Sequence, residues 1–293
     1  MKKRVFQRWA DDPPVLDHLI EARLGVTRSE ARVLVARGSV QIDGRRATNA
    51  ERTVSVGEKV AVHTGPLEVP PPLIYAYRDH DLAIVDKPAG LPSQPEPKQE
   101  AHSLTAAVTR ELGVDARAMH RLDKEASGLV VVALQREMYE RLQRAFAEHA
   151  IDRRYLAVAG GELVGDETVR ARIGRRPRDQ RLRAALPENG KEGDPACTHV
   201  RSLGHGTLDG APITAVELVL ETGRTHQIRV HLQSIGHPLV GDAAYGGAKF
   251  ERLCLHAYAV ELAHPRTGKP LRVSTALPEA FVRLVPRLTS PFR

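Results

Sequence analysis

The chain has 293 residues, a formal net charge of +7 and a sequence pI of about 9.6, a balance that favours a polyanionic partner and makes phosphate the first candidate. No stretch approaches the apolar length that a membrane-spanning helix needs, and no apolar segment follows the basic start, so we expect neither a membrane anchor nor a secretory signal. Two distant cysteines, Cys197 and Cys254, predict neither a disulfide framework nor a zinc site and favour a reducing cytoplasm.

Residues 13–63 form the first predicted domain. Apolar residues at helical spacing predict a helix over 16–24 that ends at Gly25. The sequence Thr27–Glu30 has the pattern of a capping box, so a second helix is expected to begin there and to end before Gly38.

Strand patterns follow these two helices. The segment 39–44 alternates in polarity and turns at Asp43-Gly44, which indicates a hairpin, and residues 53–62 read as further strands. The order helix, helix, hairpin resembles the alpha-L RNA-binding domain first described in a small-subunit ribosomal protein. That resemblance implies that the second helix and its adjoining loop contact structured RNA, through Arg28, Arg32 and Arg37. On charge alone, a merely solvated basic helix is the alternative.

A Pro-rich segment, residues 64–72, predicts a semi-rigid linker, and residues 73–293 form the second domain. Helical spacing appears over 104–112 and 138–146 within it. The densely basic stretch 170–183 fits either a solvated loop or a contact with an RNA backbone.

The stretch 119–134 places one carboxylate, Asp123, directly before a buried strand. His120 and Arg121 precede it, Ser127-Gly128 supplies a turn, and the following residues are apolar and largely β-branched. A carboxylate placed there is held rigidly, although an aspartate that merely caps a turn fits the local pattern too.

A second stretch, residues 221–247, carries Arg224 at a predicted junction between a strand and a helix. Thr225 is expected to cap that helix, which ends at Gly236. Three histidines lie in this stretch, but their spacing places no pair of zinc ligands on one helix face, so we predict no metal site.

The chain lacks the signatures of a P-loop, a dinucleotide-binding loop and a serine-hydrolase elbow. What remains is a well-placed aspartate, an arginine, an aromatic residue on a strand and a basic surface. That set fits chemistry on an RNA base, which must be extruded from its stack and held against an aromatic face.

Six motifs in this order resemble those of the RluA-type pseudouridine synthases: Lys87–Leu91, His120–Asp123 with Ser127–Leu129, Arg154-Tyr155, Gly223–Arg229, His237–Gly246 and Leu255–Thr267. The resemblance implies an α+β fold with a curved, mixed and mainly antiparallel sheet. It also implies isomerisation of uridine to pseudouridine in RNA, most of all large-subunit ribosomal RNA, without a cofactor or metal.

The resemblance further implies site roles. Asp123 is the catalytic residue, Tyr155 packs on the flipped uracil, and Arg224 pairs with Asp123. Three further residues are expected to contact the substrate: His120, Arg121 and Leu255. Arg121 fills the gap that the base leaves in the RNA stack, and Leu255 lines the base pocket. A monomer without membrane contact is expected.

Three other interpretations stay open. The first is a non-catalytic RNA-binding or ribosome-assembly factor on the same fold, and the second is a transfer RNA pseudouridine synthase. The third is a nucleoside or glycoside hydrolase, which would need a second carboxylate near Asp123, such as Glu125. The sequence does not identify the modified uridine.

Overall fold

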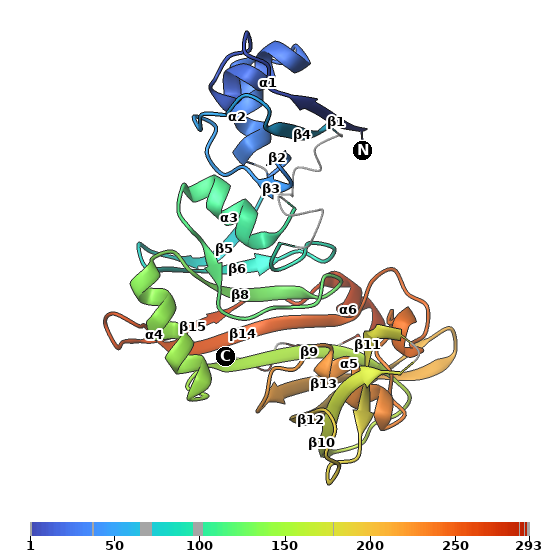
Figure 1. Ribbon diagram of the computed structural model, residues 1–293. Coiled ribbons are helices and arrows are strands. Elements are labelled where there is room, and N and C mark those ends of the chain that lie inside the picture. The colour runs from blue at the N-terminus through green and yellow to red at the C-terminus, as the bar shows by residue number, and fades with distance from the viewer. Residues whose placement is uncertain are drawn as a thin grey trace. The chain divides into compact units, whose positions relative to one another are not determined.

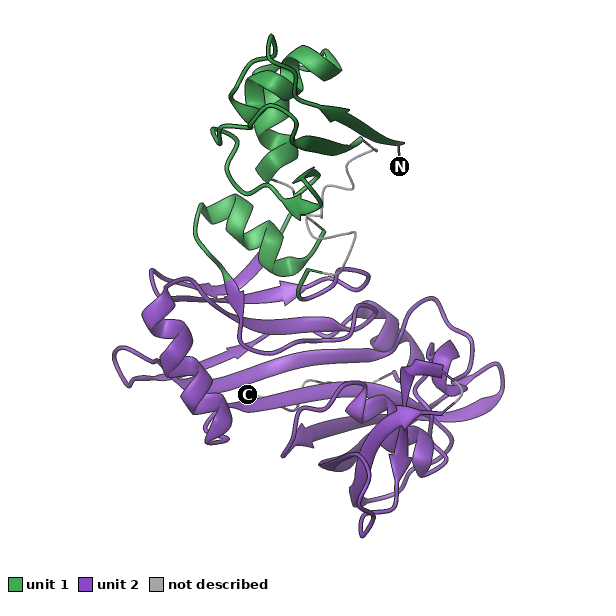
Figure 2. Ribbon diagram, in the orientation of Figure 1, with its two compact units in different colours: residues 1–73, 94–116 green, residues 74–93, 117–293 purple. Residues whose placement is uncertain are grey.

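A computed structural model describes most of the chain; the described residues are 2–36, 38–64, 72–95, 102–177, 179–286, 288, 289 and 291 (Figure 1). It contains two compact units, one of residues 1–73 with 94–116 and the other of residues 74–93 with 117–293 (Figure 2). Within the described residues, no helix is both long and apolar enough to cross a membrane. The predicted linker, 64–72, falls almost entirely outside the described residues.

The first unit combines three helices with a small sheet whose strand order is β1-β4-β2-β3. Its described elements are β1 (Lys2–Gln7), α1 (Leu16–Leu24), α2 (Arg28–Ala36), β2 (Val40–Ile42), β3 (Arg45–Arg46), β4 (Lys59–Thr64) and α3 (Leu104–Leu112). Apolar residues from α1, α2 and the sheet pack together in one core, with Leu16, Leu34 and Val60 among them.

Local signals account for both predicted helices. Gly25 adopts a left-handed conformation (φ +68°) at the end of α1, and Glu30 accepts hydrogen bonds from the main chain and hydroxyl of Thr27, as in a capping box. The predicted strand pattern over 53–56 is wrong, because only Thr53 forms a bridge there. Strand β1 was not predicted, and it pairs antiparallel with β4.

The second unit is built on one long sheet whose strand order is β11-β10-β12-β13-β9-β14-β8-β6-β5. In addition, β15 pairs with β14 and β7 pairs with β8. All pairings are antiparallel except that of β8 with β14, which confirms the predicted mixed, mainly antiparallel sheet. Its strands are β5 (Ile74–Arg78), β6 (Leu82–Lys87), β7 (Arg117–Ala118), β8 (Ser127–Ala133), β9 (Asp152–Gly160), β10 (Asp166–Arg176), β11 (Asp179–Leu186), β12 (Asp194–Leu208), β13 (Ala211–Leu220), β14 (Leu255–Ala263) and β15 (Pro270–Ser274).

Helices cover this sheet. They are α4 (Arg136–Ala147), α5 (Gln227–Ser234), the 3-10 turn η1 (Ala243–Tyr245) and α6 (Glu279–Leu284). Leu142 of α4 packs in one cluster with Leu129 and Val131 of β8, and Phe281 of α6 packs in another with Leu156 of β9. The basic stretch 170–183 is not a loop; its described residues form the hairpin of β10 and β11.

Strand β8 lies in the interior of the sheet, and all seven of its residues are buried. Where it meets β14, a Cβ on Gly128 would lie 2.2 Å from the carbonyl oxygen of Ala257, and Gly128 has a φ of +111°. Only glycine fits there. The loop before β8, which carries Asp123, is therefore fixed directly against the centre of the sheet.

Candidate active site

The loop that carries Asp123 is anchored on both sides. Ser93 Oγ accepts a hydrogen bond from the main-chain N–H of Leu122 and donates one to its carbonyl oxygen, both at 2.9 Å. Asp123 itself begins a tight turn in which its carbonyl oxygen accepts from the N–H of Ala126 (3.1 Å). The backbone around the carboxylate is thus held by bonds that do not involve the carboxylate.

Beneath this loop lies a fully buried lysine, Lys87, at the end of β6. Its Nζ donates to four main-chain carbonyl oxygens, those of Pro88, Leu91, Lys124 and Ala126, at 2.5–3.2 Å. Burial lowers the pKa of Lys87 to about 7, whereas the charges of Asp123 and Glu125 favour the ammonium form. Lys87 therefore ties the loop of the Lys87–Leu91 motif to the loop of Asp123.

The cation that pairs with Asp123 is Arg229, on α5. Its Nη1 donates to Asp123 Oδ2 (3.1 Å), and its Nε and Nη2 donate to the two carboxylate oxygens of Asp242 (2.7 and 2.8 Å). Burial would lower the pKa of Arg229, but hydrogen bonds to Asp242 and the charge of Asp123 raise it above its ordinary value. The arginine is a fixed cation between two carboxylates.

The predicted pairing of Arg224 with Asp123 is wrong. Arg224 lies in the exposed turn before α5, and its Nε donates to the carbonyl oxygen of Pro195 (3.2 Å). The helix starts later than expected, at Gln227, and its N-cap is His226 with a left-handed φ of +58°, not Thr225. This turn directs Arg224 away from Asp123 and brings the first turn of the helix, with Arg229, to it. Arg224 still lines the same cavity.

Asp123 opens into a cavity of about 300 Å³. The neighbouring strands β9 and β14 provide Tyr155 and Leu255, two residues apart in register and both buried, as walls of this cavity. Burial raises the pKa of the Tyr155 phenol. The structure therefore brings Asp123, Tyr155 and Leu255 together, as an aromatic and apolar pocket beside one carboxylate requires.

His120 and Arg121 line the cavity in different ways. Arg121 is exposed at the cavity, where its guanidinium can reach a bound ligand. His120 Nε2 accepts a hydrogen bond from the N–H of Val131 (3.1 Å), and its ring packs near Phe146. Burial lowers the pKa of His120 well below 6.5, so the ring is neutral and forms part of the cavity wall.

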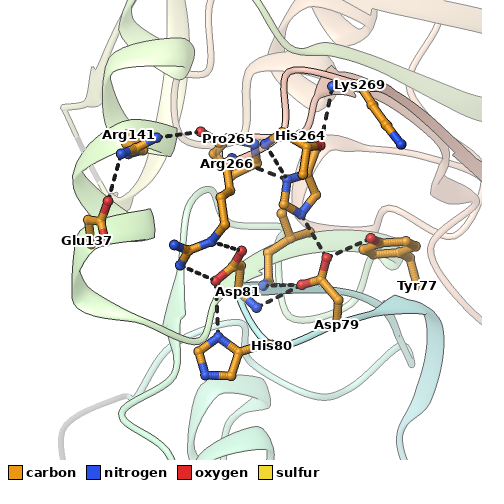
Figure 3. Close-up of polar contacts among 12 residues, drawn as sticks. Tyr77, Asp79, His80, Asp81, Glu137, Arg141, His264, Pro265, Arg266 and Lys269 are labelled. Atoms are coloured by element: carbon orange, nitrogen blue, oxygen red, sulfur yellow. Dashed lines mark hydrogen bonds and ion pairs between the residues drawn. The ribbon is translucent and has the colours of Figure 1, made fainter.

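The described residues contain two clusters with the chemistry of metal ligands, and Asp123 belongs to neither. In one, Asp79 accepts from Tyr77 and His264 (both 2.7 Å), while Asp81 accepts both arms of Arg266 (2.6 Å each) (Figure 3). Hydrogen bonds to Arg266, ahead of other causes, lower the pKa of Asp81 to about 2. These contacts join the turn between β5 and β6 to the hairpin of β14 and β15.

The predicted RNA contacts of the first unit share one anchor. Arg28 and Arg32 of α2 donate through Nε to a single oxygen of Asp17, at 3.0 and 2.7 Å, and the Asp17 side chain is fully buried. Both arginine side chains stay nearly half exposed, although Nη2 of Arg32 also donates to Glu51 (2.9 Å). Arg37, the third predicted contact, lies outside the described residues.

Sequence profiles place the chain among known proteins. The profile of the RNA pseudouridylate synthase family matches residues 81–234, and that of the S4 domain matches residues 16–60, within the region that resembles the alpha-L domain. The chain belongs to the RNA pseudouridylate synthase family. The synthase thus combines the predicted catalytic fold with the predicted N-terminal RNA-binding domain, and RNA is its substrate class.

Curated relatives and solved structures agree. The synthase is 35% identical over 291 residues to a protein of Xanthomonas campestris pv. campestris named ribosomal large subunit pseudouridine synthase D, with 89% of this chain and 85% of the relative covered. It is 32% identical over 295 residues to the Escherichia coli protein of the same name, covering 91% and 87%. The structure of human RNA pseudouridylate synthase domain containing 1 superposes with a TM-score of 0.64 at 28% identity, covering 78% of this chain and 94% of that one.

Proposed function

We propose that the synthase converts uridine to pseudouridine in large-subunit ribosomal RNA, with Asp123 as the catalytic residue. One observation carries the assignment of Asp123: its carboxylate lines the cavity beside Tyr155 and Leu255 and is held by the buried guanidinium of Arg229. The names of the relatives support ribosomal RNA as the substrate. Transfer RNA is the alternative substrate of the same reaction.

The reaction needs no cofactor in this proposal because its atoms balance within the substrate. The N-glycosidic bond of the uridine breaks, the uracil rotates while bound, and a new bond joins the ribose to carbon five. The proton that carbon five loses is matched by one gained at the nitrogen released from the sugar. Asp123 acts by attack on the ribose, by attack on the base or by removal of a sugar proton.

The cavity supplies the binding part of this chemistry. A flipped uracil would lie against the Tyr155 ring and the Leu255 side chain, since both wall the cavity next to Asp123. Arg121, exposed at the cavity, would fill the space that the base leaves in the RNA stack. Arg224 lines the cavity from the turn before α5 and would contact the RNA backbone rather than Asp123.

The rest of the chain would deliver the RNA. We assign residues 13–63 to recognition of structured RNA through Arg28, Arg32 and Arg37, residues 64–72 to the linker, and residues 73–293 to catalysis. A monomeric enzyme is part of this proposal, as the resemblance implies. Its substrate and its two free cysteines support a cytoplasmic location.

The test is the variant Asp123→Asn, assayed by tritium release from unmodified ribosomal RNA labelled at carbon five of uridine. We expect turnover to be lost and RNA affinity to stay within about twofold, because the amide keeps the shape of the side chain but lacks the charge. Glu125→Gln is the matched control, since Glu125 is exposed and does not line the cavity, and it should release tritium like the parent. Substantial turnover by Asp123→Asn would refute the assignment.

The same assay separates the other interpretations. If the protein is an RNA-binding or assembly factor, the unmutated chain will bind the RNA and release no tritium. A hydrolase would produce free uracil. Glu221 is the carboxylate besides Asp123 in the cavity lining, and it is engaged by His199 Nε2 at 2.7 Å, which disfavours that chemistry.

A further inference from the structure

A buried tyrosine, Tyr245, contacts both of the side chains that face Asp123. It ends the 3-10 turn η1, and its side chain is almost fully buried. The guanidinium carbon of Arg229 lies 4.9 Å from the centre of its ring, and its hydroxyl lies 2.7 Å from Nδ1 of His226. His226 in turn has its Nε2 at 3.9 Å from Asp123 Oδ1. Tyr245 thus contacts two residues, Arg229 and His226, that lie next to the proposed catalytic carboxylate.

The hydroxyl of Tyr245 has a second neighbour, which bears on the direction of its hydrogen bonds. The main-chain N–H of Arg183 donates to the hydroxyl oxygen at 2.9 Å. An N–H can only donate, so the hydroxyl oxygen accepts from Arg183. The single proton of the hydroxyl needs an acceptor, and Nδ1 of His226 is the one that the described residues place beside it. Burial lowers the pKa of His226, which favours the neutral ring. A neutral ring that accepts at Nδ1 carries its proton on Nε2, and that proton faces Asp123.

His226 is held in this position by more than its hydrogen bond. It has a positive φ of +58°, a conformation that residues other than glycine rarely adopt, directly before α5. Its ring meets the Tyr245 ring edge to face, with centroids 5.7 Å apart. An unusual backbone conformation that neighbours hold in place is typical of functional sites.

Arg183 belongs to β11, in the hairpin of β10 and β11 that carries the basic stretch. The contact to Tyr245 uses its main chain, while its side chain turns back to the carbonyl oxygens of Gln180 and Leu182. A shift of the hairpin would therefore move the donor of the Tyr245 hydroxyl without any change in the cavity residues themselves.

We propose that Tyr245 is a positioning residue that couples the arginine-rich hairpin to the catalytic carboxylate. RNA lying along the hairpin fixes the N–H of Arg183, which fixes the Tyr245 hydroxyl and keeps the Nε2 proton of His226 directed at Asp123. The catalytic constellation is then complete only when the hairpin is in place. This inference rests on the proposed role of Asp123.

The test is Tyr245→Phe, which removes the hydroxyl and keeps the ring that packs on Arg229. We expect kcat to fall about tenfold with KM and RNA affinity within about twofold, because the hydroxyl that orients His226 and accepts from Arg183 is lost while the cavity residues stay in place. Nitrogen-15 NMR of the imidazole should report the Nε2–H tautomer of His226 in the parent and a mixture of tautomers in the variant. Arg183→Ala should keep the parent tautomer, because its main-chain N–H remains.

Tyr77→Phe is the control, since it also removes a hydroxyl hydrogen bond to a neighbour, Asp79, in the separate cluster of Figure 3. It should match the parent in kcat and tautomer. Parent kcat and an unchanged His226 tautomer in Tyr245→Phe would overturn the proposal, as would a loss confined to RNA affinity. An active Asp123→Asn variant would instead overturn the proposed function, so the two failures are distinguishable.

Discussion

Each unit of the chain contains a carboxylate paired with arginine, and the two arrangements are reversed. In the first unit Asp17 is fully buried and its partners, Arg28 and Arg32, have side chains 47% and 46% exposed. In the second unit the arginine is the buried partner, with the Arg229 side chain 7% exposed, and Asp123 at 13% faces the cavity. In each pair, the partner that faces solvent or the cavity is the one available to RNA.

Under the proposed function, the reversal fits a binding role for the first pair and a catalytic role for the second. A buried carboxylate that holds two exposed guanidinium groups orients these cations at the surface, which suits phosphate contacts. A buried guanidinium that holds a carboxylate at a cavity keeps one anion charged and in place, which suits chemistry on a single base. We therefore expect a change at Asp17 to alter RNA affinity and a change at Arg229 to alter turnover.

The largest effect is expected for Arg229→Met. It leaves Asp242 buried without its bidentate partner and Asp123 without its cation, so we expect turnover to be lost and the free energy of unfolding to fall by about 3–5 kcal/mol, as for other broken buried ion pairs. Urea unfolding together with the tritium-release assay measures both.

Arg224→Met is the matched control for stability. It removes an exposed arginine from the same motif, whose side chain donates to a carbonyl oxygen, so the free energy of unfolding should change by less than about 0.5 kcal/mol. An equal loss of stability in the two variants would contradict the pairing of Asp123 with Arg229.

Mild acid should lower the stability of the second unit more than that of the first. Burial lowers the pKa of His231 and His256, both in the second unit, to about 4. Between the unfolded pKa of about 6.5 and this value the unfolded chain binds protons that the folded unit does not, so stability falls as the pH falls, by about 2 kcal/mol per histidine near pH 5. In the first unit burial raises the pKa of Asp17, but hydrogen bonds from Arg32 and Arg28 lower it overall, so that contribution is lost only below about pH 4.

The sole tryptophan, Trp9, makes this measurable, because its fluorescence reports on the first unit while far-UV circular dichroism is dominated by the larger sheet. Urea midpoints recorded near pH 7 and pH 5 should shift more by circular dichroism than by fluorescence. His231→Gln should reduce that shift, because it removes one of the buried histidines that bind a proton only in the unfolded chain. Equal shifts for both probes would contradict the expected contrast.

The smallest effect is expected for Asp17→Asn. Removal of a negative charge from a basic surface would by itself tighten RNA binding, whereas loss of the anchor for Arg28 and Arg32 weakens it, and we expect the second effect to prevail by about tenfold in Kd. Glu51→Gln removes an exposed charge that also contacts Arg32, and should not weaken binding. Filter binding at one fixed salt concentration shows whether the Kd for RNA rises or falls.

Local signals in the sequence predicted several elements well. The capping box at Thr27 and Glu30 begins α2, and the apolar run after Ser127 is the buried strand β8. Strand β1 was missed because its pairing partner, β4, lies more than fifty residues away and its own pattern is weak. The sequence does not predict the hairpin of β10 and β11, because its many arginines hide the alternation of a strand.

The sequence by itself was enough to predict the family, the α+β catalytic fold with its N-terminal RNA-binding domain, and Asp123 as the catalytic residue, because these predictions depend on motifs whose residues are close together in the chain. Only the tertiary structure decided that Arg229 rather than Arg224 holds Asp123, across 106 positions. Both arginines lie in one motif five residues apart. A left-handed turn at His226 and the fixed carboxylate of Asp242 select between them, and contacts that distant in sequence arise only when the sheet has formed.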